Sequence, residues 1–401
     1  MKKFNKNSLV FGFTIVFVIV GFFGSAIPSL AKSFSEKVSG VDSDSVKDKM
    51  IAMWNSMHDN TDESLSYFTN LMDLNSVKEN LLGTKMMIKS DTTVIKSNSE
   101  NLSIICEPLS DEEIQQTVDK ISQLKRVTEN SGANFLYCAA PNKEYYETFP
   151  DNFPNPFRDN YARFITELQE SNIPYINFVD TFSKTCEKRN DIFFVTDSHW
   201  KPRTGFMANR YLCEELGTRY GFLYNEKYID IGNYEIKKYK NWFLGCWGKK
   251  TGTYFTWKGA DDFELFTPRF ATDLLLEEPL KKEKKEGKFE DTVLYLENLE
   301  KDYYNKESYA VYNGGNRQLQ IVKNNLNPNG KKVLIVRDSF ACVVTPFLSL
   351  QTSELHICDV RKHQDGEKID VEDYIKKMSP DYVIVLYAGV GKQSNPLYNF
   401  F

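Results

Sequence analysis

Two short motifs in this chain carry the residue types of a nucleophilic site. Asp197-Ser198-His199-Trp200 follows an apolar run at 192–195, and Arg337-Asp338-Ser339-Phe340 follows an apolar run at 333–336. A serine, a histidine and an aspartate are the parts of a Ser-His-Asp triad. The chain has only four histidines, so a histidine separated by one residue from an aspartate is an informative pairing.

In such a site Ser339 would be the nucleophile, His199 its base and Asp197 the partner of the imidazole ring. A neutral imidazole can take the serine proton at physiological pH, and an aspartate fixes the ring's tautomer. Backbone N–H groups at the start of a helix after Ser339 would steady a developing oxyanion. The motifs alone leave an alternative open, because Asp-Ser pairs are common and a histidine beside a tryptophan is often a core residue.

The elements that must position these residues alternate between helix and strand. Apolar runs typical of buried strands lie at 134–140, 174–179, 192–195, 333–336, 354–358 and 382–386. Amphipathic helices are predicted behind a capping box at 110–113, at 157–171 and from about 203 to 220. This alternation indicates an α/β fold with a mostly parallel sheet and helices on both faces. Ligands of such sheets bind beyond the carboxyl ends of the strands, where Pro141, Asp197, His199 and Ser339 fall.

Composition restricts the class of protein. With 401 residues, of which 41% are hydrophobic and 14% aromatic, the chain can bury a substantial core. The net charge of -5 and the lack of a basic stripe give no reason to expect a nucleic-acid partner. Seven cysteines form no CxxC pair and no metal-ligand spacing, so we expect no metal site and mostly small buried residues, and we expect no cofactor. An odd number argues against a complete disulfide framework and leaves open whether any pair is bridged.

The N-terminus has the pattern of a membrane-targeting segment. Basic residues precede an uncharged apolar run at 9–31, which is long enough to cross a bilayer core of ~30 Å as a helix. Because the basic flank stays in the cytoplasm, the body is expected outside the membrane. Two outcomes remain open: an uncleaved anchor helix in the cell membrane, or a signal peptide cut after Ser29-Leu30-Ala31 and a secreted body.

The rest of the chain divides by composition. We expect a targeting segment at 1–32, a polar stalk and lead-in at 33–100, and an α/β domain at 101–401. Within that domain, residues from about 225 to 315 form an inserted aromatic-rich segment. The charged run at 281–286 is predicted to be a solvated loop, because runs of mixed sign seldom bind a partner.

Several further stretches occur in a fixed order from about residue 75 to 390. They are Ala140-Pro141-Asn142-Lys143-Glu144-Tyr145, Thr196 to Pro202, Gly245 to Gly252, Thr267 to Phe270, Lys332 to Phe340, and Pro346-Phe347. In this order they resemble the DHHW family of bacterial surface proteins, which is similar to the SGNH-hydrolase-like domains of alginate O-acetylation proteins. The resemblance implies an SGNH-hydrolase-like (flavodoxin-like) fold and a triad of Ser339, His199 and Asp197.

Two positions depart from the family's pattern. The family name records Asp-His-His-Trp, and here Ser198 stands at the second position, so only His199 remains as the base. The usual Gly-Asp-Ser is Arg337-Asp338-Ser339, which places a bulky cation where close backbone approach is expected. Arg337 has two interpretations, a partner for an anionic group or a surface cation.

Two residues in the matched stretches are candidate oxyanion donors. The resemblance implies that Gly245 or Asn142 supplies a donor comparable to the Gly and Asn of ordinary SGNH sites. Asn142 can equally be interpreted as a turn residue after Pro141.

Tryptophans supply the candidate substrate contacts, among them Trp200 and Trp247. Three of the five, Trp242, Trp247 and Trp257, lie within 16 residues. Flat aromatic faces suit sugar stacking, although a Trp-rich stretch is more often part of a core.

The leading hypothesis is an extracytoplasmic O-acetyltransferase that passes an acetyl group through Ser339 to a cell-surface polysaccharide. An esterase would use the same residues with water as the acceptor. A non-catalytic glycan-binding or assembly module would use the aromatic residues alone. The resemblance also implies a membrane-bound O-acyltransferase as a partner.

Overall fold

The computed structural model describes residues 61–89, 92–150, 153–184, 189–361, 368–390 and 396–401. The chain divides into two compact units, Met1–Met72 and Asp73–Phe401. The described part of the first unit belongs to helix α4 (Thr61–Leu81). The predicted membrane segment at 9–31 lies outside the described residues. Within the ranges given above, no helix is both long and apolar enough to cross a membrane.

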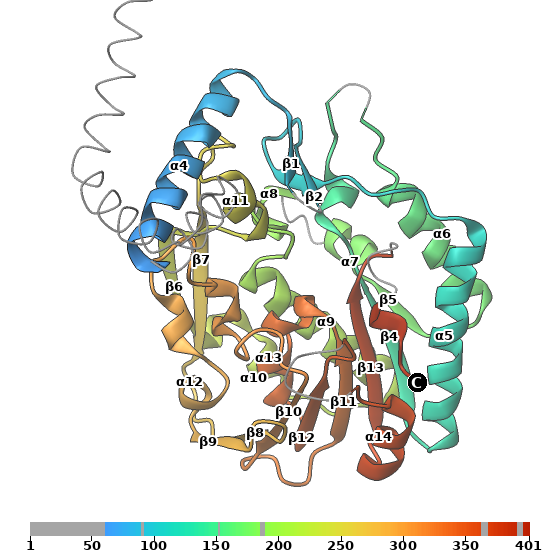
Figure 1. Cartoon of the computed structure of the whole chain (residues 1–401). Helices are drawn as coiled ribbons and strands as arrows, with labels where there is room; N and C mark the ends of the chain where they lie inside the picture. Colours follow the sequence, from blue (N-terminus) through green and yellow to red (C-terminus); the bar gives the residue numbers. More distant parts are fainter. Residues whose placement is uncertain (1–60, 90–91, 151–152, 185–188, 362–367, 391–395) are drawn as a thin grey trace, which may run out of the picture. The chain divides into compact units, whose positions relative to one another are not determined.

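An eight-stranded sheet forms the centre of the second unit (Figure 1). Its order is β5-β4-β13-β11-β12-β10-β8-β9. The bounds are β4 Asn134–Ala140, β5 Tyr175–Asn177, β8 Leu274–Glu278, β9 Glu283–Gly287, β10 Leu319–Asn324, β11 Lys332–Arg337, β12 Glu354–Cys358 and β13 Tyr382–Ala388. The first five strands run parallel, and β10, β8 and β9 pair antiparallel. The sheet is therefore mixed, and the sequence predicted only its parallel part.

Helices cover both faces of this sheet, as the apolar strands predicted. Along β11, Val333 and Ile335 pack into the cluster that holds α9 (Pro202–Tyr220). Leu334 and Val336 point the other way, into the cluster of α5 (Asp111–Asn130) and α6 (Phe157–Glu170). A strand buried on both faces needs apolar residues at successive positions, which is why β11 is a continuous apolar run. The Ser110 capping box starts α5 as expected.

Two smaller antiparallel sheets accompany the central one. Strands β1 (Met86–Lys89), β2 (Thr92–Lys96) and β3 (Leu102–Ile104) form the first, and β6 (Tyr234–Phe243) pairs with β7 (Asp261–Pro268) in the second. The remaining helices are short: η1 Lys143–Tyr146, α7 Phe178–Lys184, α8 Arg189–Ile192, α10 Glu226–Ile229, η2 Ile231–Asn233, α11 Cys246–Thr251, α12 Phe289–Thr292, η3 Leu296–Leu299, η4 Ser308–Val311, η5 Ser339–Val343, α13 Thr345–Ser349 and α14 Val371–Met378.

Three local predictions were wrong. The run at 192–195 is not a strand: α8 ends at Ile192, and the chain folds back so that the Lys201 N–H donates to the Ile192 carbonyl at 2.8 Å. The run at 174–179 is a strand only over Tyr175–Asn177 and then turns into α7. The charged run at 281–286 contributes to the edge strand β9, although most of its side chains are exposed.

Candidate functional site

Ser339 lies where the central strand β11 ends and η5 begins. The side chain of Asp338 fixes this turn: its Oδ1 accepts the Phe340 N–H at 2.9 Å, and its Oδ2 accepts the Ala388 N–H at 2.7 Å. One carboxylate thus ties the serine turn to the end of the neighbouring strand β13. Burial raises the pKa of Asp338, against the opposing effect of these backbone hydrogen bonds. The turn therefore holds the serine at the carboxyl edge of the sheet.

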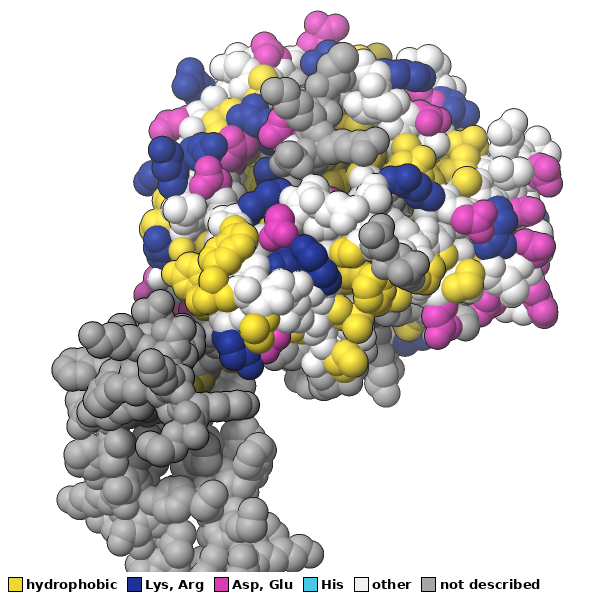
Figure 2. All heavy atoms as spheres, turned by 90° about the horizontal axis from the view of Figure 1, so that it is seen from above, with side chains coloured by type: hydrophobic (Ala, Val, Ile, Leu, Met, Phe, Trp, Pro, Cys, Tyr) yellow, Lys and Arg dark blue, Asp and Glu magenta, His cyan; other side chains and the backbone are white. Residues whose placement is uncertain are grey.

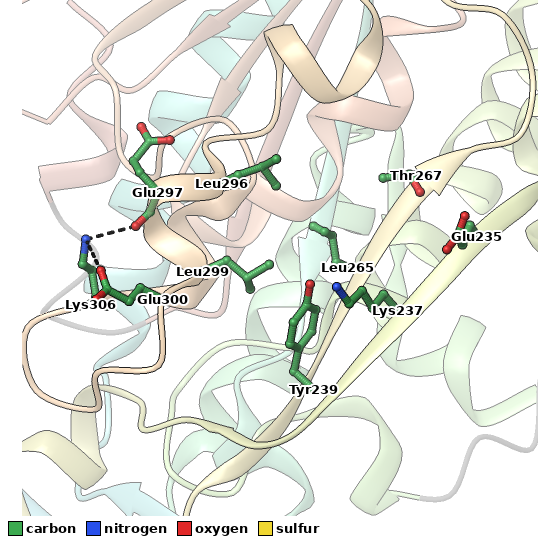
Figure 3. A pocket seen from close by; sticks show the side chains of 10 residues that line it. All are labelled: Glu235, Lys237, Tyr239, Leu265, Thr267, Leu296, Glu297, Leu299, Glu300 and Lys306. Atoms are coloured by element: carbon green, nitrogen blue, oxygen red, sulfur yellow. Dashed lines mark hydrogen bonds and ion pairs between the residues drawn. The ribbon is translucent and has the colours of Figure 1, made fainter.

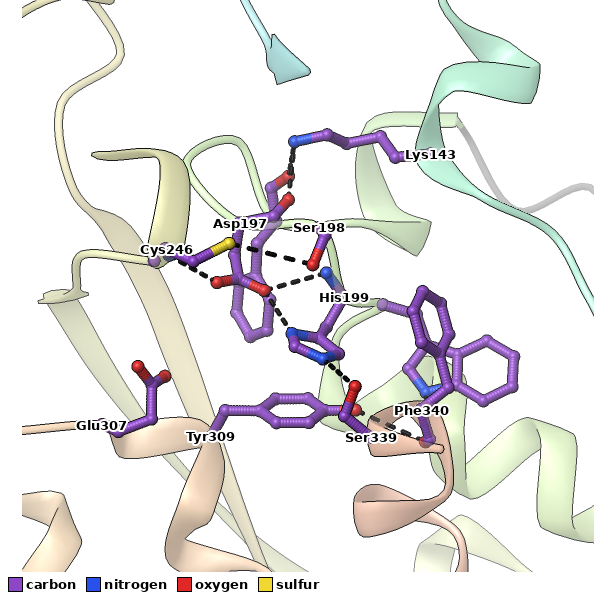
Figure 4. Close-up of polar contacts among 12 residues, drawn as sticks. Lys143, Asp197, Ser198, His199, Cys246, Glu307, Tyr309, Ser339 and Phe340 are labelled. Carbon is purple, nitrogen blue, oxygen red and sulfur yellow. Dashed lines mark hydrogen bonds and ion pairs between the residues drawn. The ribbon is translucent and has the colours of Figure 1, made fainter. Parts of the chain in front are cut away.

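The structure brings Ser339, His199 and Asp197 together (Figure 4). The His199 Nε2 lies 2.6 Å from the Ser339 Oγ, and the His199 Nδ1 lies 2.5 Å from the Asp197 Oδ1. The same Oδ1 accepts the His199 backbone N–H at 2.8 Å. An ionised carboxylate only accepts hydrogen bonds, so Nδ1 carries the proton and Nε2 is left to accept the Ser339 hydroxyl. This is the orientation in which an imidazole can deprotonate a serine.

The electrostatics of the pair favour an ionised aspartate. Burial alone would raise the pKa of Asp197, but the charge and hydrogen bonds of His199 and the Cys246 N–H hold it below its ordinary value. Burial alone would lower the pKa of His199, but the Asp197 carboxylate raises it. Asp197 is 2% exposed and His199 is 18% exposed, so the carboxylate is enclosed while the ring remains reachable.

Gly245 stands against the back of Asp197. A Cβ on Gly245 would come 2.1 Å from the Asp197 Cβ and 2.5 Å from its Oδ2. This approach lets the next residue, Cys246, donate its N–H to that Oδ2 at 2.7 Å. The Gly245 N–H itself donates to the Thr196 Oγ1 at 2.9 Å. Gly245 therefore supports Asp197, and its N–H is engaged rather than presented to an oxyanion.

Three aromatic residues enclose the histidine and the serine turn. The Tyr309 ring stacks on the His199 ring, with centroids 4.3 Å apart and planes 21° apart. The Phe340 carbonyl, next to Ser339, accepts from the Trp200 Nε1 at 2.9 Å and from the Tyr309 hydroxyl at 3.4 Å. Trp200 is fully buried, so it stabilises the serine turn through this hydrogen bond and has no ring face exposed to a sugar. Sequence reasoning missed Tyr309, whose only signal was its place in an aromatic-rich segment.

Arg337 is neither a surface cation nor free to bind a substrate. It is 1% exposed, and its guanidinium donates to the Asn316 side chain at 2.9 Å and to the carbonyls of Gly315 and Arg317 at 3.0 Å. The Asp359 carboxylate lies 3.7 Å away and supplies the anionic partner. A cation tolerates this position because polar groups converge on it.

Asn142 follows β4, two strands away from Ser339 at the same edge of the sheet. A Cβ on Gly389, which follows the intervening strand β13, would lie 1.3 Å from the Asn142 Oδ1. Within the described residues the Asn142 side chain has no hydrogen-bond partner, and it does not cap η1. The Asn142 side chain thus lies against Gly389, and its role as an oxyanion donor stays a prediction.

The three clustered tryptophans lie in different surroundings. Trp247 packs against the small cluster of Met87, Val94, Leu102 and Phe255. Trp242 is half-buried and donates to the Leu299 carbonyl at 2.7 Å, whereas Trp257 is 61% exposed. Only Trp257 thus offers most of its surface to solvent.

On the face drawn in Figure 2, Lys and Arg side chains are interspersed with Asp and Glu.

A pocket of about 580 Å³ lies between the two-stranded β6–β7 sheet and η3 (Figure 3). Its walls include Tyr239, Leu265, Leu296, Leu299, Glu235 and Lys306. No residue of the triad lines it. Lys306, which lines the pocket, is nevertheless only three residues before Tyr309, whose ring stacks on His199, so one segment contributes to both the pocket and the triad.

In the part of the chain that the structure describes, no cluster of side chains could hold a metal ion.

The mixed sheet, the helices on both faces and the serine at the carboxyl edge define an SGNH-hydrolase-like α/β fold. A family model described as "SGNH hydrolase-like domain, acetyltransferase AlgX" matches residues 103–228. The matched range contains Asp197 and His199 and ends before Ser339. The resemblance to the alginate O-acetylation proteins is thereby confirmed.

Solved structures show the same fold. PatB1 of Bacillus cereus with a sulfonyl adduct is 19% identical, covering 79% of this chain and 99% of its own, with a TM-score of 0.61. A DHHW family protein from Eubacterium siraeum is 17% identical, covering 79% and 97%, with a TM-score of 0.57. The likeness to the DHHW family is confirmed by this second structure. Among curated proteins, no sequence matches.

Proposed function

We propose that the chain is an extracytoplasmic O-acetyltransferase that acts on a cell-surface polysaccharide through Ser339, His199 and Asp197. The observation that carries the proposal is the hydrogen-bond chain from the serine hydroxyl through the imidazole to a buried carboxylate. The matched family model is described as an acetyltransferase, which favours acyl transfer among the reactions of this fold. The assembled triad speaks against a module that only binds glycans.

In the first half of the reaction, the Ser339 Oγ attacks the carbonyl carbon of an acetyl donor while the His199 Nε2 takes its proton. The tetrahedral intermediate collapses to acetyl-Ser339, and the imidazolium returns the proton to the leaving group. Asp197 stabilises the imidazolium throughout. In the second half, a sugar hydroxyl attacks the acetyl carbonyl, His199 takes its proton, and that proton returns to Ser339 as the acetylated sugar leaves.

Charge develops on the carbonyl oxygen in both halves and needs donors aimed at it. The Asn142 amide is the side-chain donor that we assign to this role, because it has no hydrogen-bond partner among the described residues and follows β4 at the same edge of the sheet as Ser339. Gly245 is not assigned, since Thr196 already accepts its N–H. Removing one oxyanion donor typically costs about 10²–10³ in kcat.

The location and the partner belong to the same proposal. A basic flank before an apolar run at 9–31 favours a single-pass anchor with the body outside the membrane. A donor in the form of a membrane-bound O-acyltransferase would then deliver acetyl groups at the same surface, as the resemblance to the alginate proteins implies.

The test uses the full chain, purified in detergent, with p-nitrophenyl acetate as donor and short glycans as acceptors. Transfer predicts acetylated sugar by mass spectrometry, with Ser339→Ala abolishing both transfer and hydrolysis. Hydrolysis that glycans merely slow, without acetylated sugar, would establish an esterase instead. Phenylmethylsulfonyl fluoride, which sulfonylates an activated serine, should modify Ser339, as peptide mapping would show. Modification of another residue instead, or activity that survives Ser339→Ala, would overturn the proposal.

A further inference from the structure

The segment that carries Asp197 and His199 lies outside the strands of the three sheets. Residues 193–200 form a loop with an isolated bridge between Phe193 and Trp200. Backbone N–H groups of Leu102, Trp247 and Gly248 donate to two of its carbonyls, those of Val195 and Thr196. In a strand, ladder hydrogen bonds would satisfy the backbone and fix its register. Here two charged side chains from distant parts of the chain satisfy much of the backbone. One donates to its carbonyl groups, and the other accepts from its N–H groups.

Lys143 satisfies the carbonyl groups. Its Nζ donates to the carbonyls of Phe194 and Val195, each at 3.1 Å, and to that of Asp197 at 2.6 Å (Figure 4). An ammonium has three protons, so all three are accounted for by this loop. The residue is 1% exposed, so these bonds form away from water. Burial lowers the pKa of Lys143, opposed by the nearby carboxylates of Glu144 and Asp261.

Asp261, the first residue of β7, satisfies the N–H groups. Its Oδ1 accepts from the Val195 N–H at 2.6 Å, and its Oδ2 accepts from the Thr196 N–H at 2.8 Å and the Thr196 hydroxyl at 2.6 Å. Asp261 is 6% exposed. The same Thr196 hydroxyl accepts the Gly245 N–H, so the contact continues to the glycine behind Asp197.

We propose that Lys143 and Asp261 are positioning residues, which clamp the 193–200 loop so that the Asp197 carboxylate and the His199 ring stay aligned with Ser339. The inference rests on the proposed function for its kinetic consequences, but its structural core concerns the Asp197–His199 hydrogen bond alone. Buried charges cost free energy unless polar partners surround them, and both charges here direct their bonds to the loop that bears the site.

The chemistry of the clamp selects lysine. Three carbonyl oxygens converge on one atom, which suits the compact ammonium, whereas the flat guanidinium of arginine presents its donors as a fork. Lys143→Met keeps much of the side-chain volume and removes the ammonium donor from all three carbonyls, of which that of Val195 still accepts the Leu102 N–H at 2.9 Å. Lys143→Arg keeps the charge and is expected to restore the alignment only in part.

Lys96 offers a matched control. It is also 1% exposed, and its Nζ donates to the Asn80 side chain at 2.6 Å and to the Phe255 carbonyl at 2.9 Å, groups outside the 193–200 loop. Lys96→Met therefore removes a buried ammonium of the same kind without touching the triad. Both variants should lower the thermal midpoint of the full chain in detergent.

Only the Lys143 variant should change the site. We expect Lys143→Met to lower kcat for p-nitrophenyl acetate about a hundredfold, as a misplacement of about 1 Å does, with little change in KM. The low-field proton NMR signal of the His199–Asp197 hydrogen bond should weaken in Lys143→Met and persist in Lys96→Met. Thr196→Val and Asp261→Asn should act in the same direction and serve if Lys143→Met does not fold.

The NMR signal separates this inference from the proposed function. If the chain hydrolyses no ester but the signal depends on Lys143, the clamp stands and the proposed reaction fails. A folded Lys143→Met with the wild-type signal, kcat and pH profile would overturn the clamp, whatever the chain's reaction is.

Discussion

The His199 Nε2 lies 2.6 Å from the Ser339 Oγ, although 140 residues separate the two in the chain. The contact depends on two separate sets of hydrogen bonds, one at the serine turn and one at the histidine loop. The Asp338 carboxylate, next to Ser339 in the sequence, fixes the serine turn to β13, whereas the buried Lys143 and Asp261, distant in the sequence, hold the histidine loop. A triad assembled in this way should fail as a unit when either partner is removed.

Ser339→Ala and His199→Ala should each lower the hydrolysis of p-nitrophenyl acetate by about a thousandfold or more, because neither the nucleophile nor the base works alone. The double variant should be little worse than either single one, since losses within a triad are not additive. Initial rates at saturating ester measure this. Ser198→Ala is the control: among the described residues that hydroxyl makes a single contact, of 3.8 Å with the Cys246 Sγ, so the variant should retain near-normal activity.

The pH profile should report the His199–Asp197 pair. The base must be neutral, so activity should rise with pH through the pKa of His199, which the Asp197 carboxylate places above its ordinary value. The midpoint of the acid limb should therefore lie above about 6.5. Asp197→Asn should move that limb to lower pH and lower the plateau by roughly 10³–10⁴-fold, because the amide favours the wrong tautomer. An acid limb that Asp197→Asn leaves in place would assign the titration to another group.

The parallel core of the fold could be predicted from the sequence because its residues permit few alternatives. β11 and β13 are buried on both faces, so they appear as unbroken apolar runs, and Ser339 falls directly beyond one of them. The antiparallel edge could not be predicted in the same way. Strand β10 alternates buried and half-buried positions and includes Gln320, Lys323 and Asn324, so its sequence lacks an apolar run.

The wrong prediction at 192–195 has a different origin. Ile192, Phe193 and Phe194 are buried whether the segment is a strand or a loop, so hydrophobicity does not distinguish the two. What decides is where the backbone hydrogen bonds go, and the Lys143 and Asp261 partners lie more than 50 residues away on either side. The burial of Arg337 escaped prediction for the same reason, since its carbonyl partners become neighbours only in the folded chain.

Gly245→Ala should damage the site through a close approach. The Gly245 backbone has φ -75° and ψ -179°, which any residue can adopt, so the glycine is required by the contact with Asp197. The added methyl should push Asp197 away, weaken the Cys246 N–H bond to it and cost about 1–3 kcal/mol of stability. Denaturant unfolding and kcat measure the two effects. Gly232→Ala is the control, because its methyl would meet only the Asp230 side chain.

The topology proposal predicts which side of the membrane the body occupies. Because a basic flank precedes the run at 9–31, protease added to intact protoplasts should digest the body of the chain. Immunoblotting with an antibody to a C-terminal tag follows the loss. A cytoplasmic marker protein should stay intact in the same sample, which controls for lysis. Protection of the tagged body until the protoplasts are lysed would place it in the cytoplasm.

Tyr309 should act on the histidine through its ring more than through its hydroxyl. The ring stacks on His199 with centroids 4.3 Å apart, whereas the hydroxyl makes a 3.4 Å contact with the Phe340 carbonyl, to which the Trp200 Nε1 also donates at 2.9 Å. Tyr309→Phe keeps the stack and should retain most of kcat. Tyr309→Leu removes the flat surface that limits the tilt of the imidazole and should lower kcat about tenfold or more, since positioning errors act strongly on catalysis. KM for a small ester should change little, because Tyr309 is buried and contacts the base. Equal activity of the Phe and Leu variants would show that the stack does not position His199.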